Sequence, residues 1–285
     1  MDEFRNLEVK FGRTFGSCHI KLGNTIVFAT TEAVIDEPPQ SRPCEGRFRL
    51  SMNVAAGGKE RWFKHLEKSQ PPESSLTTRA IEKIMNHLNV IDLESLCLVA
   101  GKHVWCINTK VVVLNYDGNL IEVTSIATMA SLMHFRLPNT TVTSEQDIIV
   151  HSFEEKVPIA LTLFHYPICV TFQSMDENEM SFILPKSELI PEVEEIKIRK
   201  AGRKLICDST EEEEAFFKNV LVLCVNTYRE IVAIKSLGRI YCTNFINKLL
   251  EECSQLAFER VHFVVNYLKS EIEKTKNSNQ LTNII

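Results

Sequence analysis

Residues 104–136 have the sequence VWCINTKVVVLNYDGNLIEVTSIATMASLMHFR, and this stretch decides the fold. It begins with a strongly apolar run, Val104–Leu114, which predicts a long β-strand. The strand ends at Tyr116–Asn119, because an Asp-Gly pair favours a turn. From Glu122 to Phe135, apolar and small residues occupy almost every side of a helix. We therefore predict a helix that is buried in the middle of the domain.

The residues before this stretch are typical of strands and turns. Apolar and polar residues alternate there, as they do in half-buried strands, and three of the strands should form an antiparallel meander. We predict these strands at Leu7–Phe11, Cys18–Leu22, Asn24–Thr30, Arg47–Asn53 and Leu96–Ala100. Prolines make residues 36–46 a loop, and Thr77 or Thr78 is the expected cap of a helix at Arg79–Leu88.

The second half partly repeats this plan and ends in a long helix. Strands are expected at Asp147–His151, Leu161–Phe164, Pro167–Phe172, Lys204–Cys207, Val220–Val225 and Glu230–Ile234. Apolar residues at helical spacing predict the closing helix from Asn244 to Lys274. The charged residues 175–202 are expected to form a surface insertion, and the polar tail 276–285 should be frayed. The predicted fold class is α/β (α+β), with mixed sheets and few crossover helices.

Composition excludes several classes of protein. No run approaches the roughly 18 apolar residues of a membrane-spanning helix, so we expect no membrane contact. Nine cysteines occur without a Cys-x-x-Cys pair, and the histidines lack paired ligand spacing, so no metal site is expected. The net charge of -5 provides no overall attraction to nucleic acid, and any RNA contact must come from a local basic patch.

Residues 104–136 resemble the ribonuclease PH-like subunits of the RNA exosome ring. The resemblance extends colinearly along the chain through Phe4–Gly12, Gly16–Thr25, Pro43–Gly46, Ile91–Gly101, Pro167–Phe172 and Val220–Asn226. It implies a single ribonuclease PH-like domain over residues 1–275, with halves at about 1–142 and 143–275. Because the match starts almost at Met1, we expect the ring contact of the relatives' N-terminal segment to be lost or replaced.

The resemblance also implies partners and a location. Members of this family form a ring of six subunits, topped by cap subunits with RNA-binding domains and threaded by single-stranded RNA. They support ribosomal RNA maturation and RNA turnover in the nucleus and nucleolus, and also in the cytoplasm. No cofactor is implied for a structural subunit of this ring.

The resemblance further implies that the phosphate site is degenerate. Active members of the family hold phosphate with an arginine a few residues beyond the Asp-Gly pair, where a guanidinium can bind it bidentately. The corresponding position here is Ile121, and Glu122 lies beside it. A branched apolar side chain cannot hold phosphate, and we expect the adjacent carboxylate to repel it.

A catalytic acid is also missing from its expected place. Active members carry an aspartate just before the strand that matches Val220–Val225, where this chain has Lys218 or Asn219. The four glutamates Glu211–Glu214 are interpreted as a solvated acidic run, because adjacent like charges repel. These losses predict a catalytically inactive member of the family.

Basic and aromatic residues of one segment could still contact RNA, because non-specific binding of single strands uses positive charge and aromatic stacking. The candidates for the RNA path are Lys59, Arg61, Trp62, Lys64, Arg79 and Lys83. A solvated loop whose Trp62 packs on a neighbouring subunit is the alternative interpretation, and nearby glutamates dilute the positive charge.

Two other functions remain possible at this point. An active phosphate-dependent 3'-5' exoribonuclease could use Asp208 and the glutamates, but Ile121 argues against it. A small-molecule kinase would need a glycine- and serine-rich phosphate loop before a helix, and Gly57-Gly58 is a weak match to one.

Overall fold

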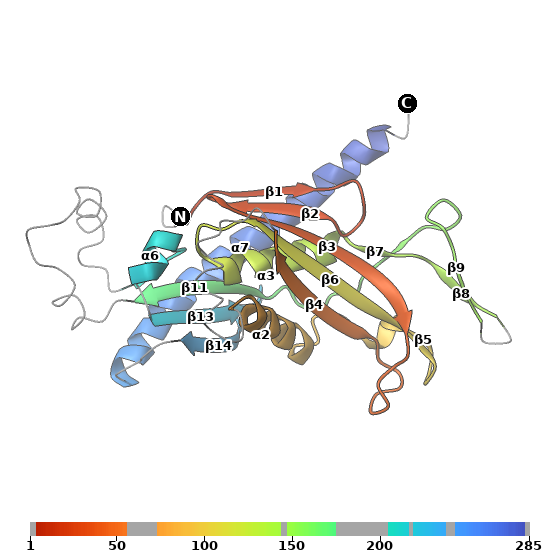
Figure 1. Cartoon of the computed structure of the whole chain (residues 1–285), viewed down its shortest axis with the longest axis horizontal. Helices are drawn as coiled ribbons and strands as arrows, with labels where there is room; N and C mark the ends of the chain where they lie inside the picture. The colour runs from red at the N-terminus through yellow and green to blue at the C-terminus, as the bar shows by residue number, and fades with distance from the viewer. Residues whose placement is uncertain are drawn as a thin grey trace, which may run out of the picture.

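The computed structural model of the protein describes residues 4–55, 73–143, 147–174, 205–216, 219–237 and 243–282. Two β-sheets lie with helices between and around them (Figure 1). The first sheet has six strands. Five follow the spatial order β1 (Leu7–Phe11), β2 (Cys18–Leu22), β3 (Thr25–Asp36), β6 (His103–Asn115) and β4 (Arg47–Val54), and β5 (Cys97–Val99) pairs with β6.

The pairing in this sheet is mixed. Strands β1, β2 and β3 form the predicted antiparallel meander, and β3 pairs antiparallel with β6 over most of its length. Strand β4 runs parallel to β6, from the pair Arg47–Cys106 to the pair Val54–Val113. The chain has to cross over between these two strands, and α2 (Glu73–His87) lies in that connection. One parallel pair beside antiparallel pairs confirms the expected mixed sheet.

The second half of the chain provides smaller sheets. A four-stranded antiparallel sheet has the order β12 (Leu205–Cys207), β11 (Ile168–Ser174), β13 (Asn219–Val225) and β14 (Ile231–Leu237). Two short pairs lie outside it, formed by β7 (Arg136–Leu137) with β10 (Ile159–Ala160), and by β8 (Thr140–Val142) with β9 (Ile148–Val150).

Helix α3 (Leu120–His134) is the buried central helix that the sequence predicts. It packs against β2, β3 and β6 on one side and against β11 on the other, so it joins the two larger sheets. Helix α7 (Thr243–Thr282) crosses behind the sheets in Figure 1 and contacts β1, β11 and β13. Two shorter helical elements complete the described chain, η1 (Glu94–Leu96) and α6 (Glu211–Phe216).

Several predicted elements differ from the structure. Strand β3 continues to Asp36, six residues beyond the predicted Thr30. Helix α2 begins at Glu73, six residues before the predicted Arg79, so neither Thr77 nor Thr78 caps it. Residues 161–164 do not form a strand, because Leu163 makes an isolated bridge with Ile91 and the nearest strand is β10. Helix α7 continues to Thr282, into the tail that was expected to fray. The predicted insertion at 175–202 lies outside the described residues.

One buried hydrophobic cluster includes side chains from both larger sheets and from α2, α3 and α7. Such a shared core holds the two halves of the chain together through burial of apolar surface. Within the described residues, no helix combines the length and apolar composition needed to cross a bilayer.

Candidate functional site

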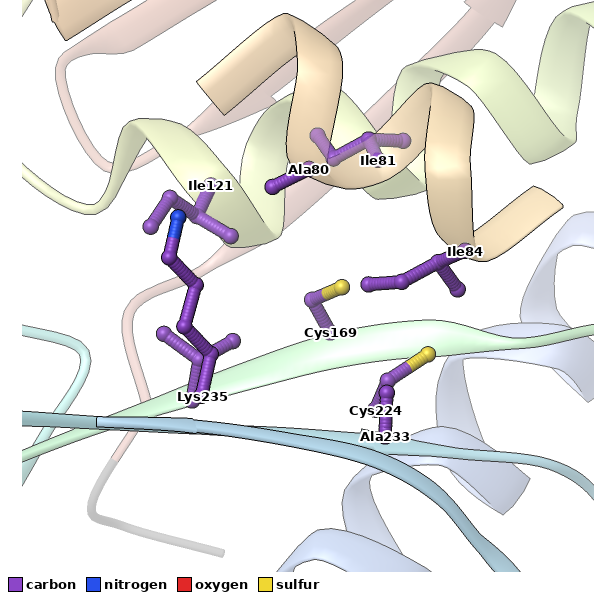
Figure 2. Close-up of a pocket in the computed structure, with 9 residues that line it drawn as sticks. Ala80, Ile81, Ile84, Ile121, Cys169, Cys224, Ala233 and Lys235 are labelled. Atoms are coloured by element: carbon purple, nitrogen blue, oxygen red, sulfur yellow. The ribbon is translucent and has the colours of Figure 1, made fainter. Parts of the chain in front are cut away.

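Ile121, in the first turn of α3, lies where the family resemblance places a phosphate-binding arginine. It faces a small cavity of about 20 Å³, which is enough space for about one water molecule. The lining residues come from α2, α3, β11, β13 and β14, and they are Ala80, Ile81, Ile84, Ile121, Cys169, Val222, Cys224, Ala233 and Lys235. Lys235 extends along the cavity with its ammonium end toward Ile121 (Figure 2). The site is therefore lined mainly by apolar side chains, and Lys235 is the one charged residue among them.

The Asp-Gly pair before α3 forms the predicted turn. Gly118 has a φ of +80°, and a Cβ at this position would lie 2.3 Å from the backbone oxygen of Ser209. The turn is thus pressed against the segment that leads into α6. Two hydrogen-bond donors of the turn bind the carboxylate of Glu214. The backbone N–H of Asn119 donates to Glu214 Oε1 at 2.8 Å, and the Tyr116 hydroxyl donates to Glu214 Oε2. A carboxylate of the protein itself thus occupies this anion-binding position.

The acidic run Glu211–Glu214 is therefore not simply solvated, as the sequence had suggested. Thr210 and Glu213 form a reciprocal capping box at the start of α6, with Thr210 N donating to Glu213 Oε2 at 3.0 Å and Glu213 N donating to Thr210 Oγ1 at 3.4 Å. Within the run only Glu212 is fully exposed. Helix geometry separates the four charges, and two of them stabilise local structure.

Asp208, the acid of the enzymatic alternative, is buried and fully engaged. Its carboxylate accepts from the backbone N–H and the Nη2 of Arg5, both at 2.7 Å, and from Asn119 Nδ2 at 2.6 Å. Three donors, one of them the Arg5 guanidinium, stabilise the carboxylate in its present position, between the chain entry to β1 and the start of α3. This carboxylate is a structural group.

Glu122 is also buried, and its expected role was wrong. Its Oε1 accepts from Arg260 Nε of α7 at 2.9 Å, and its Oε2 accepts from Asn119 Nδ2 at 2.9 Å. Burial raises the pKa of Glu122, and the nearby Arg260 lowers it by less. The side chain points into the interior, so it does not repel an ion at Ile121 but joins α3 to α7.

The remaining degenerate position and the RNA-path candidates are only partly described. Lys218, Lys59, Arg61, Trp62 and Lys64 lie outside the described residues. Asn219 is the first residue of β13, where it pairs with Ser174 across the sheet. Arg79 and Lys83 are exposed one helical turn apart on α2, and neither has an ion-pair partner in the part of the chain that the structure describes. Among the same residues, no cluster of three or more side chains could hold a metal ion.

The sequence did not reveal the polar network of Arg5, Asn119, Asp208, Glu122 and Arg260. Thr171 Oγ1 extends it by donating to Asn119 Oδ1 at 2.5 Å. One signal for it was present, since Arg260 interrupts the apolar face of α7 at the spacing that buries Ala257 and Val264. A charged residue on a buried helical face needs a partner, and Glu122 provides it.

Comparison with known proteins gives the class first. The family model described as "3' exoribonuclease family, domain 1" matches residues 3–138. The Archaeoglobus fulgidus exosome with RNA bound to the active site superimposes with a TM-score of 0.65 at 20% identity, covering 91% of this chain and 89% of that one. Rrp46 of rice gives 0.57 at 12% identity, with 95% of both chains covered. The fold is that of the ribonuclease PH-like proteins.

Curated relatives narrow this to a particular family. Exosome complex component RRP45 of Saccharomyces cerevisiae is 37% identical over 239 residues, which are 83% of this chain and 73% of the yeast protein. The RRP45 proteins of Danio rerio and Schizosaccharomyces pombe are 32% and 28% identical, over 96% of this chain and over 62% and 84% of their own lengths. The chain belongs to the RRP45 family.

Proposed function

We propose that this protein is a non-catalytic ring subunit of the RNA exosome, which supports 3'-5' RNA processing and decay by forming part of the RNA channel. The observation that carries the proposal is the cavity at Ile121. Its walls are mainly apolar, and its volume of about 20 Å³ corresponds to about one water molecule, which disfavours binding of the phosphate ion that phosphorolysis consumes. No guanidinium among the lining residues could hold that ion in place.

The acids near the start of α3 support the same conclusion. Asp208 and Glu122 are saturated by Arg5, Asn119 and Arg260, and Glu214 binds the turn before α3. A general acid must reach a leaving group in the substrate. These carboxylates are engaged inside the fold, so the alternative of an active exoribonuclease lacks both of its reactive parts.

Catalysis is tested by incubating the purified chain with single-stranded RNA and inorganic phosphate. We expect no nucleoside diphosphate and no shortening of the RNA 3' end. An active phosphorolytic ribonuclease PH serves as the positive control under the same conditions. Phosphate-stimulated release of nucleoside diphosphates by the chain alone, in proportion to its concentration, would overturn the assignment.

The proposed partners are other ribonuclease PH-like ring subunits and cap subunits with RNA-binding domains. Membership of the RRP45 family supports this, because the relatives in that family are components of the exosome complex. The described surface also exposes apolar residues at the open edge strand β14, where Ile231 is 39% and Ile234 is 53% exposed. Ring closure buries edges and strips of this kind.

Assembly is tested by copurification. The tagged full chain, expressed in a eukaryotic cell, is expected to recover stoichiometric ribonuclease PH-like subunits together with cap subunits. Native mass spectrometry then gives the composition of the ring. Recovery of the chain as a stable, isolated monomer contradicts the proposal. Imaging of the tagged chain checks the expected location in the nucleus and nucleolus and also in the cytoplasm.

The proposed RNA path uses Arg79 and Lys83 with the basic residues 59–64. Two cations on one helix face, neither with an ion-pair partner among the described residues, attract phosphates of a single strand without sequence preference. In the assembled ring, the double variant Arg79→Glu/Lys83→Glu is expected to weaken crosslinking of channel RNA to this subunit severalfold. The matched double reversal Lys274→Glu/Lys276→Glu, on α7, should leave crosslinking unchanged. Equal effects of the two variants contradict this path.

A further inference from the structure

Two cysteines that are far apart in sequence are held together on the surface. Cys44 lies in the loop before β4, and Cys97 is the first residue of β5. Their side chains are within hydrogen-bonding reach of each other. Cys44 is exposed and Cys97 is partly exposed, so small solutes can reach both sulfurs.

The backbone fixes this approach from both sides of Cys44. On one side the oxygen of Pro43 accepts from Gly101 N at 2.8 Å, and on the other Gly46 N donates to the oxygen of Leu93 at 2.8 Å. The two partner residues lie on either side of Cys97 in the sequence. Gly46 also packs so closely that a Cβ there would lie 2.6 Å from Leu96 Cβ. The loop is thus attached to the β5 hairpin at each end of the cysteine.

We propose that Cys44 and Cys97 form a peroxide-sensitive dithiol, which oxidises reversibly to an intramolecular disulfide on the surface of the folded chain. This site goes beyond the proposed role in the ring and does not depend on it. Exposed thiols held next to a second thiol are the ones that oxidise to disulfides.

The chemistry proceeds in two balanced steps. The Cys44 thiolate attacks one oxygen of hydrogen peroxide, the O–O bond breaks, and the departing hydroxide takes up a proton, which leaves a sulfenic acid and water. Cys97 sulfur then attacks the Cys44 sulfur, the S–O bond breaks, and a second water leaves as the disulfide forms. Cys44 is the more exposed of the two sulfurs, so it is the first that peroxide reaches.

A second pair provides an internal control. Cys169 and Cys224 face each other across β11 and β13, and both sulfurs lie on the cavity side of the sheet (Figure 2). They are 2% and 1% exposed, and the hydrogen bond with Cys169, followed by burial, raises the pKa of Cys224. The two pairs differ in access to solvent. Only the surface pair should therefore oxidise in the folded state.

The test is peroxide treatment of the reduced, full-length chain, followed by alkylation and tryptic digestion without reduction. Cys44 and Cys97 are the sole cysteines of the expected peptides 22–47 and 84–102, so a linked peptide identifies the bond. We expect this species to exceed any Cys169–Cys224 link about tenfold and to disappear on reduction. Mass spectrometry measures both.

Variants separate the outcomes. Cys44→Ser should abolish the link and leave Cys97 open to alkylation, and Cys97→Ser should leave a Cys44 sulfenic acid that dimedone traps. Cys169→Ser should keep the link unchanged. Oxidation of Cys44 without a bond to Cys97, a link that forms only in denaturant, or a bond between two chains would each overturn the proposal.

Discussion

At the residue scale, the pairing of Glu122 with Arg260 has the largest expected effect on stability. Both side chains are almost fully buried, at 0% and 6% exposure, and Arg260 also lies over the ring of Phe4 at 4.4 Å. A buried ion pair contributes little to the free energy of unfolding compared with an apolar replacement of both partners. Removal of one partner, however, leaves the other charge buried without a counterion. The pair is therefore sensitive to single substitutions.

We predict that Arg260→Met lowers the free energy of unfolding by about 3–5 kcal/mol, because Glu122 loses its buried partner. Denaturant unfolding followed by circular dichroism measures the change. Lys274→Met removes the exposed pair of Lys274 and Glu271 on the same helix and should leave stability essentially unchanged. Similar losses in the two variants would show that the burial of the pair has no special effect.

His134 gives the protein a pH-dependent stability. Its ring lies 4.8 Å from that of Phe11, and burial, followed by repulsion from Arg136, lowers its pKa from 6.5 to about 4. The unfolded chain therefore binds a proton below pH 6.5 that the folded chain rejects until about pH 4. Stability from this group is complete above pH 6.5 and is lost as the pH falls toward 4.

We predict that His134→Phe reduces the loss of unfolding free energy between pH 7 and pH 4.5 by up to about 2 kcal/mol, after allowance for solvent screening. Urea titrations at the two pH values measure this difference. His87→Phe changes an exposed histidine and should retain the wild-type loss. An unaltered pH dependence in His134→Phe contradicts the prediction.

The sequence predicted Ile121 through its position beyond the Asp-Gly pair, but it could not predict the direction of Glu122. These neighbours lie on one helical turn, and only the three-dimensional position of Arg260 makes the interior side of α3 favourable for a carboxylate. The 138 residues between the partners explain why local patterns did not show the pair. The position of a residue in a motif could thus be used for prediction, whereas a pairing between distant residues could not be predicted.

At the scale of elements, the turn before α3 and the segment before α6 fit closely together. Gly118 and Gly101 both have positive φ, at +80° and +74°, but a Cβ at 101 would meet nothing within 4 Å. We predict that Gly118→Ala lowers the free energy of unfolding by about 2–4 kcal/mol, through backbone strain plus the clash with Ser209. Gly101→Ala should lose only about 1 kcal/mol from its φ. Equal losses, measured by thermal and denaturant unfolding, would mean that this packing has no effect.

Apart from β3, which continues to Asp36 beyond the predicted Thr30, strands with alternating residues were predicted with nearly correct bounds, because the pattern is local and each strand has one buried face. The start of α2 was missed for the opposite reason. Residues 73–77 lack a strong apolar stripe, and the turn there forms as a continuation of a helix that packs on β4 and α3. Residues 161–164 are apolar enough for a strand. Among the described residues, however, their only β-bridge joins Leu163 to Ile91, so no strand forms.

At the scale of the whole molecule, α7 connects the halves. Among the α7 residues whose burial the structure describes, Ile272 is the last buried one, and it follows Arg260, Val261, Val264, Val265 and Leu268 in the core. We predict that a chain ending at Lys276 keeps its unfolding temperature within about 2 °C, since no buried apolar side chain among the described residues is removed. A chain ending at Glu259 should fail to fold cooperatively.

Differential scanning calorimetry of both shortened chains provides the measurement, with the full chain as reference. The result also tests the proposal that residues 1–275 form one domain. Cooperative unfolding of the chain that ends at Glu259 would show that the fold forms without the C-terminal part of α7. The sequence predicted the repeat of sheets and helices in the two halves, but not that α3 and α7 would share a buried ion pair.

The cavity at Ile121 also limits how this family could change. An arginine restored at this position would bring a guanidinium among Ile84, Cys169 and Cys224, where there is space for a single water. Overpacking costs about 1–3 kcal/mol, and a buried cation without a partner adds to this. A phosphate-binding site at this position would thus require several simultaneous substitutions, so a single substitution of Ile121 is not expected to create one.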